Sequence, residues 1–270
     1  MYARSDIGEI LTENRSFWRL AERTTVEQFI NYLIENASLK KYELRSENYG
    51  KTITRYSWGE VSPYRLALSI KNGSYLTHGT AIFFHALSDS IPKYVYVNTE
   101  QSKKPPTETR LSQSSIDLAF TRQPRQSNLM YELDELKVVV ISGKSTERLG
   151  VELMPDENGN LVDVTGLERT LIDIVVRPNY SGGVFQLLEA YVRAIDRIST
   201  NKLLSTLKKL DYAYPYHQAI GFLMEHAGYP AKKYKHFSDL GINFDFYLAH
   251  GMASTEFDSK WRLHFPKGLK

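Results

Sequence analysis

The sequence feature that most constrains the fold is an amphipathic segment near the N-terminus. From Thr24 to Asn36 the apolar residues recur at the i, i+3, i+4, i+7 and i+8 positions of a half-buried helix, namely Val26, Phe29, Ile30, Leu33 and Ile34. Thr24 or Thr25 can cap the first turn, with Glu27 or Gln28 placed to complete a capping box. The spacing therefore predicts a helix over this segment.

Two alternating segments follow this helix directly. Leu39–Arg45 and Ile53–Trp58 flank a polar stretch, Ser46–Lys51, that contains turn-forming residues, so we expect a β-hairpin. Upstream, Asp6–Glu13 and Ser16–Glu22 have the pattern of two shorter helices. A winged helix-turn-helix has this order of helices followed by a hairpin. We therefore expect one over residues 1–60.

The polar side chains of this segment suit contact with duplex DNA. The face of the predicted helix opposite the apolar stripe displays Thr25, Gln28, Asn31, Tyr32 and Glu35. Gln and Asn amides can bind the adenine edge, and cations can bind phosphates. The hairpin and its flanks supply the cations Lys40, Lys41, Arg45, Lys51 and Arg55. The helix itself has no Lys or Arg, and a solvated polar face on a small α+β domain explains the same pattern.

From residue 61 onward the pattern indicates a second, larger domain with a β-rich first half and a helical second half, giving an α+β chain overall. The expected helices are Ser62–Ile70, Thr77–Leu87, Leu167–Val175, Gly183–Ile195, Thr200–Leu210 and Gln218–Ala227. The expected strands are Tyr94–Asn98, Ser115–Thr121, Leu136–Ser142, Gly150–Met154 and Leu161–Val164. Residues 61–270 are therefore predicted to form a mixed α/β domain.

The common signatures of catalysis and metal binding are absent from the sequence. There is no cysteine, no Walker loop, no dinucleotide fingerprint and no nucleophile elbow. Gly73-Ser74 is followed by Asp89 but not by the paired carboxylates of a nucleotidyltransferase. We therefore expect no metal, no cofactor and no enzymatic activity. Acidic residues interrupt the first twenty positions where a signal peptide needs an apolar run, which favours a cytoplasmic protein without a membrane partner.

Several ordered motifs resemble those of the AbiEi antitoxin family of type IV toxin-antitoxin systems. One runs from Gly166 through Asp173 and Arg177-Pro178 to Gly182-Gly183, continuing to Leu188–Tyr191. The others are Gly73–Ala81 with His85–Leu87, Tyr96–Ser102, Tyr214–Phe222 and Asn243–Leu248. Together with the predicted N-terminal helix, these motifs cover the chain from about Thr24 to Leu248.

The resemblance implies a DNA-binding transcriptional repressor with a role in phage defence by abortive infection. Its N-terminal winged helix would bind inverted repeats in its own promoter, where a dimer is one option. Its C-terminal domain would neutralise a nucleotidyltransferase toxin without a stable complex. The antitoxin-domain residues that the motifs single out are Glu168, Arg169, Asp173, Arg177 and His217.

Two alternatives stay open at this stage. The chain would be a plain transcription regulator if no toxin gene lies beside its own. It would be an enzyme acting on nucleotides if Glu168, Arg169, Asp173 and His217 formed a site. Arg169 and Asp173, four residues apart on one predicted helix, also suit a structural ion pair. The Gly182 and Gly183 amides suit either a helix cap or an anion.

Overall fold

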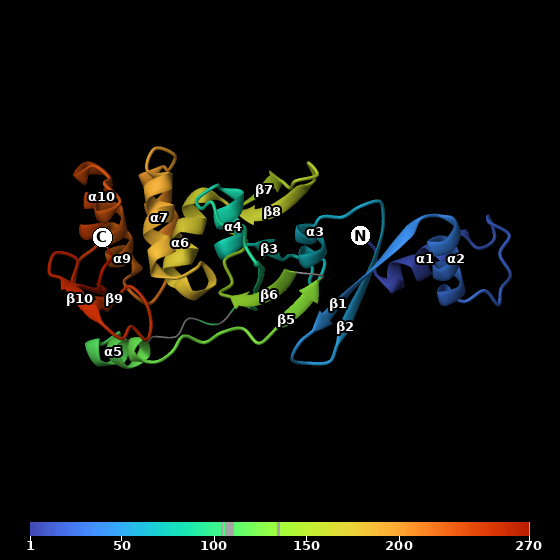
Figure 1. Cartoon of the computed structure of the whole chain (residues 1–270), viewed down its shortest axis with the longest axis horizontal. Coiled ribbons are helices and arrows are strands. Elements are labelled where there is room, and N and C mark those ends of the chain that lie inside the picture. Colours follow the sequence, from blue (N-terminus) through green and yellow to red (C-terminus); the bar gives the residue numbers. More distant parts are fainter. Residues whose placement is uncertain (104, 106–110, 134–135, 270) are drawn as a thin grey trace.

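The structure is a computed structural model that describes residues 1–103, 105, 111–133 and 136–269. The molecule is elongated, with two helices at one end, a sheet in the middle and a helical layer at the other end (Figure 1). The described residues form ten α-helices, which are α1 (Arg4–Asn14), α2 (Val26–Asn36), α3 (Pro63–Leu68), α4 (His78–Phe84), α5 (Gln113–Thr121), α6 (Leu167–Val176), α7 (Val184–Ala194), α8 (Thr200–Leu210), α9 (Tyr216–His226) and α10 (Ala231–Ser238).

Eleven strands form two sheets within the same described residues. The strands are β1 (Leu39–Ser46), β2 (Thr52–Trp58), β3 (Tyr75–Leu76), β4 (Tyr94–Glu100), β5 (Met130–Leu133), β6 (Leu136–Gly143), β7 (Val151–Pro155), β8 (Leu161–Thr165), β9 (Phe246–Tyr247), β10 (Thr255–Asp258) and β11 (Leu263–Pro266). The large mixed sheet has the order β2-β1-β5-β6-β4-β3-β8-β7, and the small one has the order β10-β11-β9. The mixed α/β content confirms the predicted α+β class.

The helix predicted over Thr24–Asn36 is confirmed, together with its cap. Thr25 Oγ1 accepts a hydrogen bond from the Gln28 amide at 3.2 Å, and Gln28 Oε1 accepts one from the Thr25 amide at 3.0 Å, which is a complete capping box. The apolar stripe of α2 packs into a small separate core with α1 and the hairpin, whose buried members are Ile7, Leu11, Phe29, Ile30, Leu39 and Tyr56. This N-terminal unit therefore has a core of its own.

The helix predicted over Ser16–Glu22 is wrong, because this segment forms turns. The Arg15 guanidinium donates hydrogen bonds to the carbonyl oxygens of Ala21, Glu22 and Thr24 at 2.7, 2.9 and 3.0 Å. These bonds wrap the chain around one side chain, and Arg19 has a φ of 55° that a right-handed helix does not allow. The chain between α1 and α2 is therefore held by Arg15 together with a few backbone turn hydrogen bonds, such as that from the Trp18 amide to the Asn14 carbonyl oxygen at 2.9 Å.

The predicted hairpin, β1 and β2, is also an edge of the large sheet. Arg45 and Ser46 of β1 pair with Glu132 and Tyr131 of β5 in antiparallel register. The N-terminal unit is thus joined to the rest of the chain by continuous backbone hydrogen bonding (Figure 1). Farther in, β4 and β6 pair in parallel over seven residues, and α4 packs against β4.

The strand predicted over Ser115–Thr121 is also wrong, because this segment is the helix α5. The Ser112 hydroxyl accepts a hydrogen bond from the Ser115 amide at 3.3 Å and so caps the first turn. Ile116 and Phe120 lie four residues apart on the buried face, which is helical spacing and not strand alternation. The sequence did not predict the short strands β3, β5 and β9 to β11 or the helix α10.

The largest core lies in the second half of the chain, where α6 to α10 pack around one another and against β9 and β11. Trp261 is fully buried in it and lies against Gly221 of α9, where any side chain would overlap the indole ring. Within this core α6 packs against α7, α8 and α9, and it also contacts α4. Among the described residues, no helix combines the length and the apolar character needed to cross a membrane.

Candidate functional site

The polar face of α2 points to solvent at the narrow end of the molecule. Thr25, Gln28 and Asn31 are exposed, and Tyr32 is 60% exposed. Asn31 lines a polar hollow of about 250 Å³ together with Lys41 of β1 and Arg4 of α1. Arg4 was not predicted as a site residue, because no pattern in the sequence connects it with the hairpin 37 residues away. The structure thus brings one amide, two cations and the Glu27 carboxylate together on this face.

Most predicted cations of the hairpin are paired with acidic residues. Lys41 Nζ lies 2.7 Å from Glu43, and Arg45 Nη2 lies 3.2 Å from the same carboxylate. The hydrogen bond with Glu43 raises the pKa of Lys41, and the one with Glu60 raises the pKa of Lys40. These lysines therefore stay charged while their field is partly cancelled. Residues 1–60 contain nine Lys or Arg and nine Asp or Glu, so the unit as a whole is neutral.

The two remaining predicted cations differ from each other. Arg55 is half-buried, and its Nη2 and Nε atoms donate to the Ser69 carbonyl oxygen at 2.6 and 3.1 Å, which ties β2 to the end of α3. Its guanidinium is hydrogen-bonded inside the protein, so its role is structural. Lys51 lies exposed just after the tip of the hairpin. Lys51 can reach a phosphate without breaking an internal contact, whereas Arg55 cannot.

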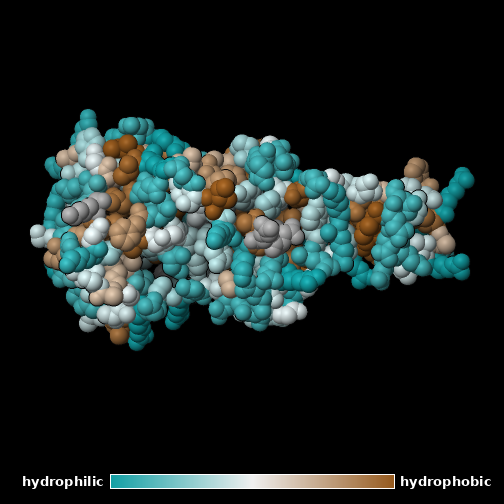
Figure 2. All heavy atoms as spheres, in the orientation of Figure 1, coloured by the Kyte–Doolittle hydropathy of each residue, from teal (hydrophilic) through white to brown (hydrophobic). Residues whose placement is uncertain are grey.

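An apolar groove of about 710 Å³ lies on the other side of α2, where Gln28 and Tyr32 line it together with Trp18 and Trp58. Figure 2 shows an apolar patch on this narrow end, flanked by hydrophilic side chains. Phe17, next to the groove in the chain, is 84% exposed. The α2 helix therefore has one polar flank with Asn31 and one apolar flank with Tyr32.

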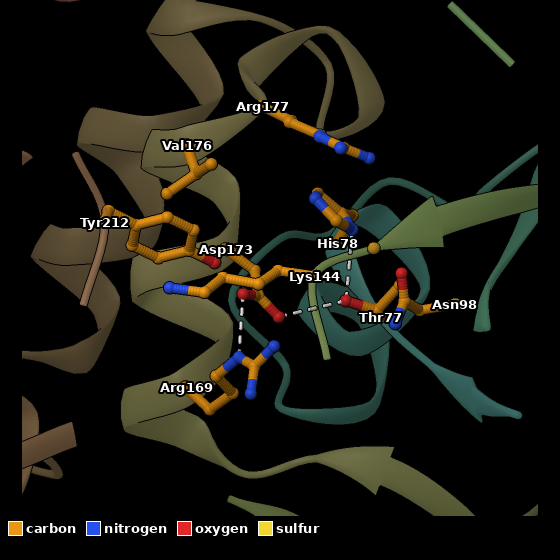
Figure 3. Close-up of a pocket in the computed structure, with 10 residues that line it drawn as sticks. Thr77, His78, Asn98, Lys144, Arg169, Asp173, Val176, Arg177 and Tyr212 are labelled. Atoms are coloured by element: carbon orange, nitrogen blue, oxygen red, sulfur yellow. Dashed lines mark hydrogen bonds and ion pairs between the residues drawn. The ribbon is translucent and has the colours of Figure 1, made fainter. Parts of the chain in front are cut away.

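A second cluster forms where two of the sequence motifs meet. Arg169 Nε of α6 lies 2.8 Å from Asp173 Oδ1, which confirms the ion pair predicted from their spacing. The two side chains are only 5% and 6% exposed. Asp173 Oδ2 also accepts a hydrogen bond from Thr77 Oγ1 at 3.2 Å (Figure 3). Arg169 Nη1 donates to the Leu149 carbonyl oxygen at 2.6 Å. The buried pair therefore fastens α6 to the strand–helix junction before α4.

This cluster lines a small pocket, here called the motif pocket, with a volume of about 70 Å³. Arg177 and His78 extend into the same space, and Lys144 extends toward Tyr212 (Figure 3). Burial lowers the pKa of His78 to about 4, so its imidazole is neutral near pH 7. Burial alone would lower the pKa of Arg169, but Asp173 raises it overall. The pocket therefore has three cations and one carboxylate.

The other two predicted antitoxin-domain residues lie outside the motif pocket. Glu168 faces α8, where its carboxylate accepts a hydrogen bond from the Ser199 amide at 3.0 Å and pairs with Lys202 at 3.0 Å. Burial opposes ionisation of Glu168, but these contacts lower its pKa overall. His217 Nε2 lies 2.8 Å from the Gly241 carbonyl oxygen, and burial lowers its pKa. The four residues considered for an enzyme site are therefore not brought together.

Lys144 and Tyr212 were not predicted as part of this pocket, since each comes from a loop with no motif of its own. Thr77 and His78 lay inside a motif, but nothing in the sequence indicated that they would meet Asp173. No group of three His, Asp or Glu side chains in the described part of the chain is placed to hold a metal ion.

Comparison with models of known protein families finds no match, and comparison with curated proteins finds none. The fold is similar to the crystal structure of the RV2827C protein from Mycobacterium tuberculosis, with a TM-score of 0.59 and 15% sequence identity. The similarity covers 99% of this chain and 86% of the other. At this identity it supports a shared fold and nothing more specific.

Proposed function

We propose that this protein is a DNA-binding autorepressor and the antitoxin of a type IV toxin-antitoxin system. In this proposal residues 1–60 act as a winged helix on inverted repeats in the protein's own promoter. The observation that supports it most is the polar hollow lined by Arg4, Asn31 and Lys41 together with Glu27. Its amide and two cations suit a base edge flanked by phosphates, and its carboxylate offsets one of the two positive charges. The resemblance to the AbiEi family supports the same assignment.

The roles of the individual side chains follow from their exposure. Asn31 would contact a base edge in the major groove, and Arg4, Lys41 and Lys51 would contact phosphates. Gln28, whose Oε1 already accepts from the Thr25 amide on the other flank of α2, would contribute only its Nε2. Because residues 1–60 carry no net charge, attraction to DNA would depend on these few cations and not on a general positive field. The salt dependence of binding would then be shallow, corresponding to a few released counterions.

In the same proposal residues 61–270 oppose a nucleotidyltransferase toxin in the cytoplasm without a stable complex and without catalysing a reaction. The buried Arg169–Asp173 pair serves as scaffold, since both side chains are satisfied inside the protein. Arg177 is the motif residue whose guanidinium faces the pocket without a hydrogen bond to any described residue, so it is the side chain we assign to neutralisation.

Binding to the region upstream of the gene tests the first half of this proposal. Fluorescence anisotropy of a labelled duplex should show Asn31→Ala weakening binding roughly 5- to 150-fold while leaving binding to an unrelated duplex unchanged. Lys41→Gln should weaken binding to both duplexes and reduce the salt slope by about 0.9. Lys232→Gln, an exposed lysine on α10, is the control. Wild-type protein that prefers neither duplex at low salt would contradict the proposal.

Co-expression with the product of the neighbouring gene tests the second half. Wild-type protein expressed from an unrelated promoter should restore growth, Arg177→Ala should fail to do so, and Asn31→Ala should succeed because DNA binding is bypassed. Equal rescue by Arg177→Ala would remove that side chain from the antitoxin mechanism. No toxicity from any neighbouring gene would leave the protein a plain regulator.

A further inference from the structure

A second cavity, of about 340 Å³, lies beside the N-terminus of α7 and is separate from the motif pocket. Its lining includes Lys93, Tyr94 and Tyr96 from β4 and the loop before it, and Asn179 and Ser181 from the loop before α7. The volume falls within the range of small-molecule sites, roughly 300 to 1,000 Å³. It is therefore large enough for a ligand, unlike the motif pocket.

Two buried polar atoms of this lining have no hydrogen-bond partner. Within the described residues only three buried side-chain nitrogen or oxygen atoms are unpaired, and two of them, Ser181 Oγ and Asn179 Nδ2, belong to this cavity. Ser181 is only 3% exposed. A buried hydroxyl or amide without a partner destabilises the protein, so such groups usually have a partner in the functional state. A ligand oxygen in the cavity would supply one for each.

The electrostatic surroundings of the cavity favour an anion. It opens at the start of α7, an 11-residue helix, where Gln186 lines it and the Gln186 backbone amide makes no hydrogen bond within the described chain. Such a helix end carries a partial positive charge. Gly182 and Gly183, which precede this helix, have φ values of 83° and 88°, which residues with side chains rarely adopt. Lys93 adds a full positive charge, and no carboxylate is among the lining residues.

One wall of the cavity is aromatic. The Tyr94 and Tyr96 rings are stacked with their centroids 6.0 Å apart, and the Tyr96 ring lies 5.6 Å from the Tyr180 ring. Tyr94 is 41% exposed, although a large ring of this kind is usually more buried. An exposed ring beside a cavity is a platform on which a planar heterocycle can stack.

From these features we propose that the cavity binds a nucleoside monophosphate. The phosphate would lie at the start of α7, where Ser181, Asn179 and the Gln186 backbone amide would donate hydrogen bonds, and the base would stack on Tyr94. This inference goes beyond the proposed function, because it concerns neither the DNA-binding face nor the motif pocket. Its success or failure is independent of whether the protein binds its promoter.

Isothermal titration calorimetry on the full chain tests the proposal with AMP, GMP, CMP and UMP, the matching nucleosides, and inorganic phosphate. At least one mononucleotide should bind about 10-fold more tightly than both its nucleoside and phosphate alone. Ser181→Ala and Tyr94→Ala should each weaken it about 10-fold. The matched controls are Ser205→Ala on α8 and Tyr49→Ala near the hairpin tip. Both residues are exposed, and neither substitution should weaken binding.

The thermal midpoint of the free protein separates a ligand contact from a structural role. Ser181→Ala should not lower it, because the substitution removes an unpaired hydroxyl and breaks no contact. The proposal is overturned if no mononucleotide binds at millimolar concentration, or if nucleoside or phosphate alone binds as tightly. It is also overturned if binding survives both Ser181→Ala and Tyr94→Ala.

Discussion

Replacing Asp173 with alanine should destabilise the protein far more than the loss of an ordinary ion pair. The substitution leaves the Arg169 guanidinium buried, with its side chain 5% exposed and without its carboxylate. It also takes one partner from the Thr77 hydroxyl, which is fully buried and keeps His78 Nδ1 at 3.0 Å. Both groups lose the one carboxylate that lines the motif pocket.

The expected magnitude follows from the burial of the pair. Removing one partner of a buried ion pair costs about 3 to 5 kcal/mol, because the other charge is left uncompensated. For a chain of this size that lowers the thermal midpoint by roughly 6 to 20 °C. The double variant Arg169→Met/Asp173→Ala removes both charges and should be more stable than Asp173→Ala alone.

Urea unfolding followed by circular dichroism gives the free energies directly. The matched control is Glu189→Ala on α7, where Glu189 pairs with Arg193 at 2.8 Å with the same i, i+4 spacing but at the surface. That variant should unfold almost like wild type. The reasoning fails if Asp173→Ala unfolds like the control, or if adding Arg169→Met makes the protein less stable still.

Two further predictions concern buried residues elsewhere. Because burial lowers the pKa of His78 to about 4, below 6.5 in the unfolded chain, stability from neutral His78 is present above pH 6.5 and lost as the pH falls toward 4. Between pH 7 and pH 5 the unfolding free energy of wild type should therefore fall by about 2 kcal/mol more than that of His78→Gln. An equal fall in both proteins would assign the pH dependence to other groups. Gly221→Ala, in which the new methyl overlaps the Trp261 ring, should cost about 1 to 3 kcal/mol despite the better helix propensity of alanine. Gly8→Ala in α1, where the methyl meets Val26 at 3.4 Å, should cost less than about 1 kcal/mol in urea unfolding, and equal effects at both positions would contradict the clash.

Features that depend on neighbouring residues could be predicted from the sequence. The cap of α2 is made by side chains three residues apart, and the turn between β7 and β8 is held by Asp156, whose Oδ1 accepts from the Asn158 and Asn160 amides at 3.0 and 2.8 Å. The Arg169–Asp173 pair needed only the helical spacing. In each case the partners are a few residues apart, so the local pattern contains the whole interaction.

The tertiary structure alone decided which distant groups meet. The two residues of β3 are a strand only because β4 and β8 supply hydrogen bonds on either side. The turns over Ser16–Glu22 are bracketed by hydrogen bonds from Arg15 to carbonyl oxygens six to nine residues away. Thr77 binds Asp173 across 96 residues, and Arg4 and Lys41, 37 residues apart, line the same hollow. Such contacts form because the packed core positions both partners. A local pattern of residue types therefore cannot predict them.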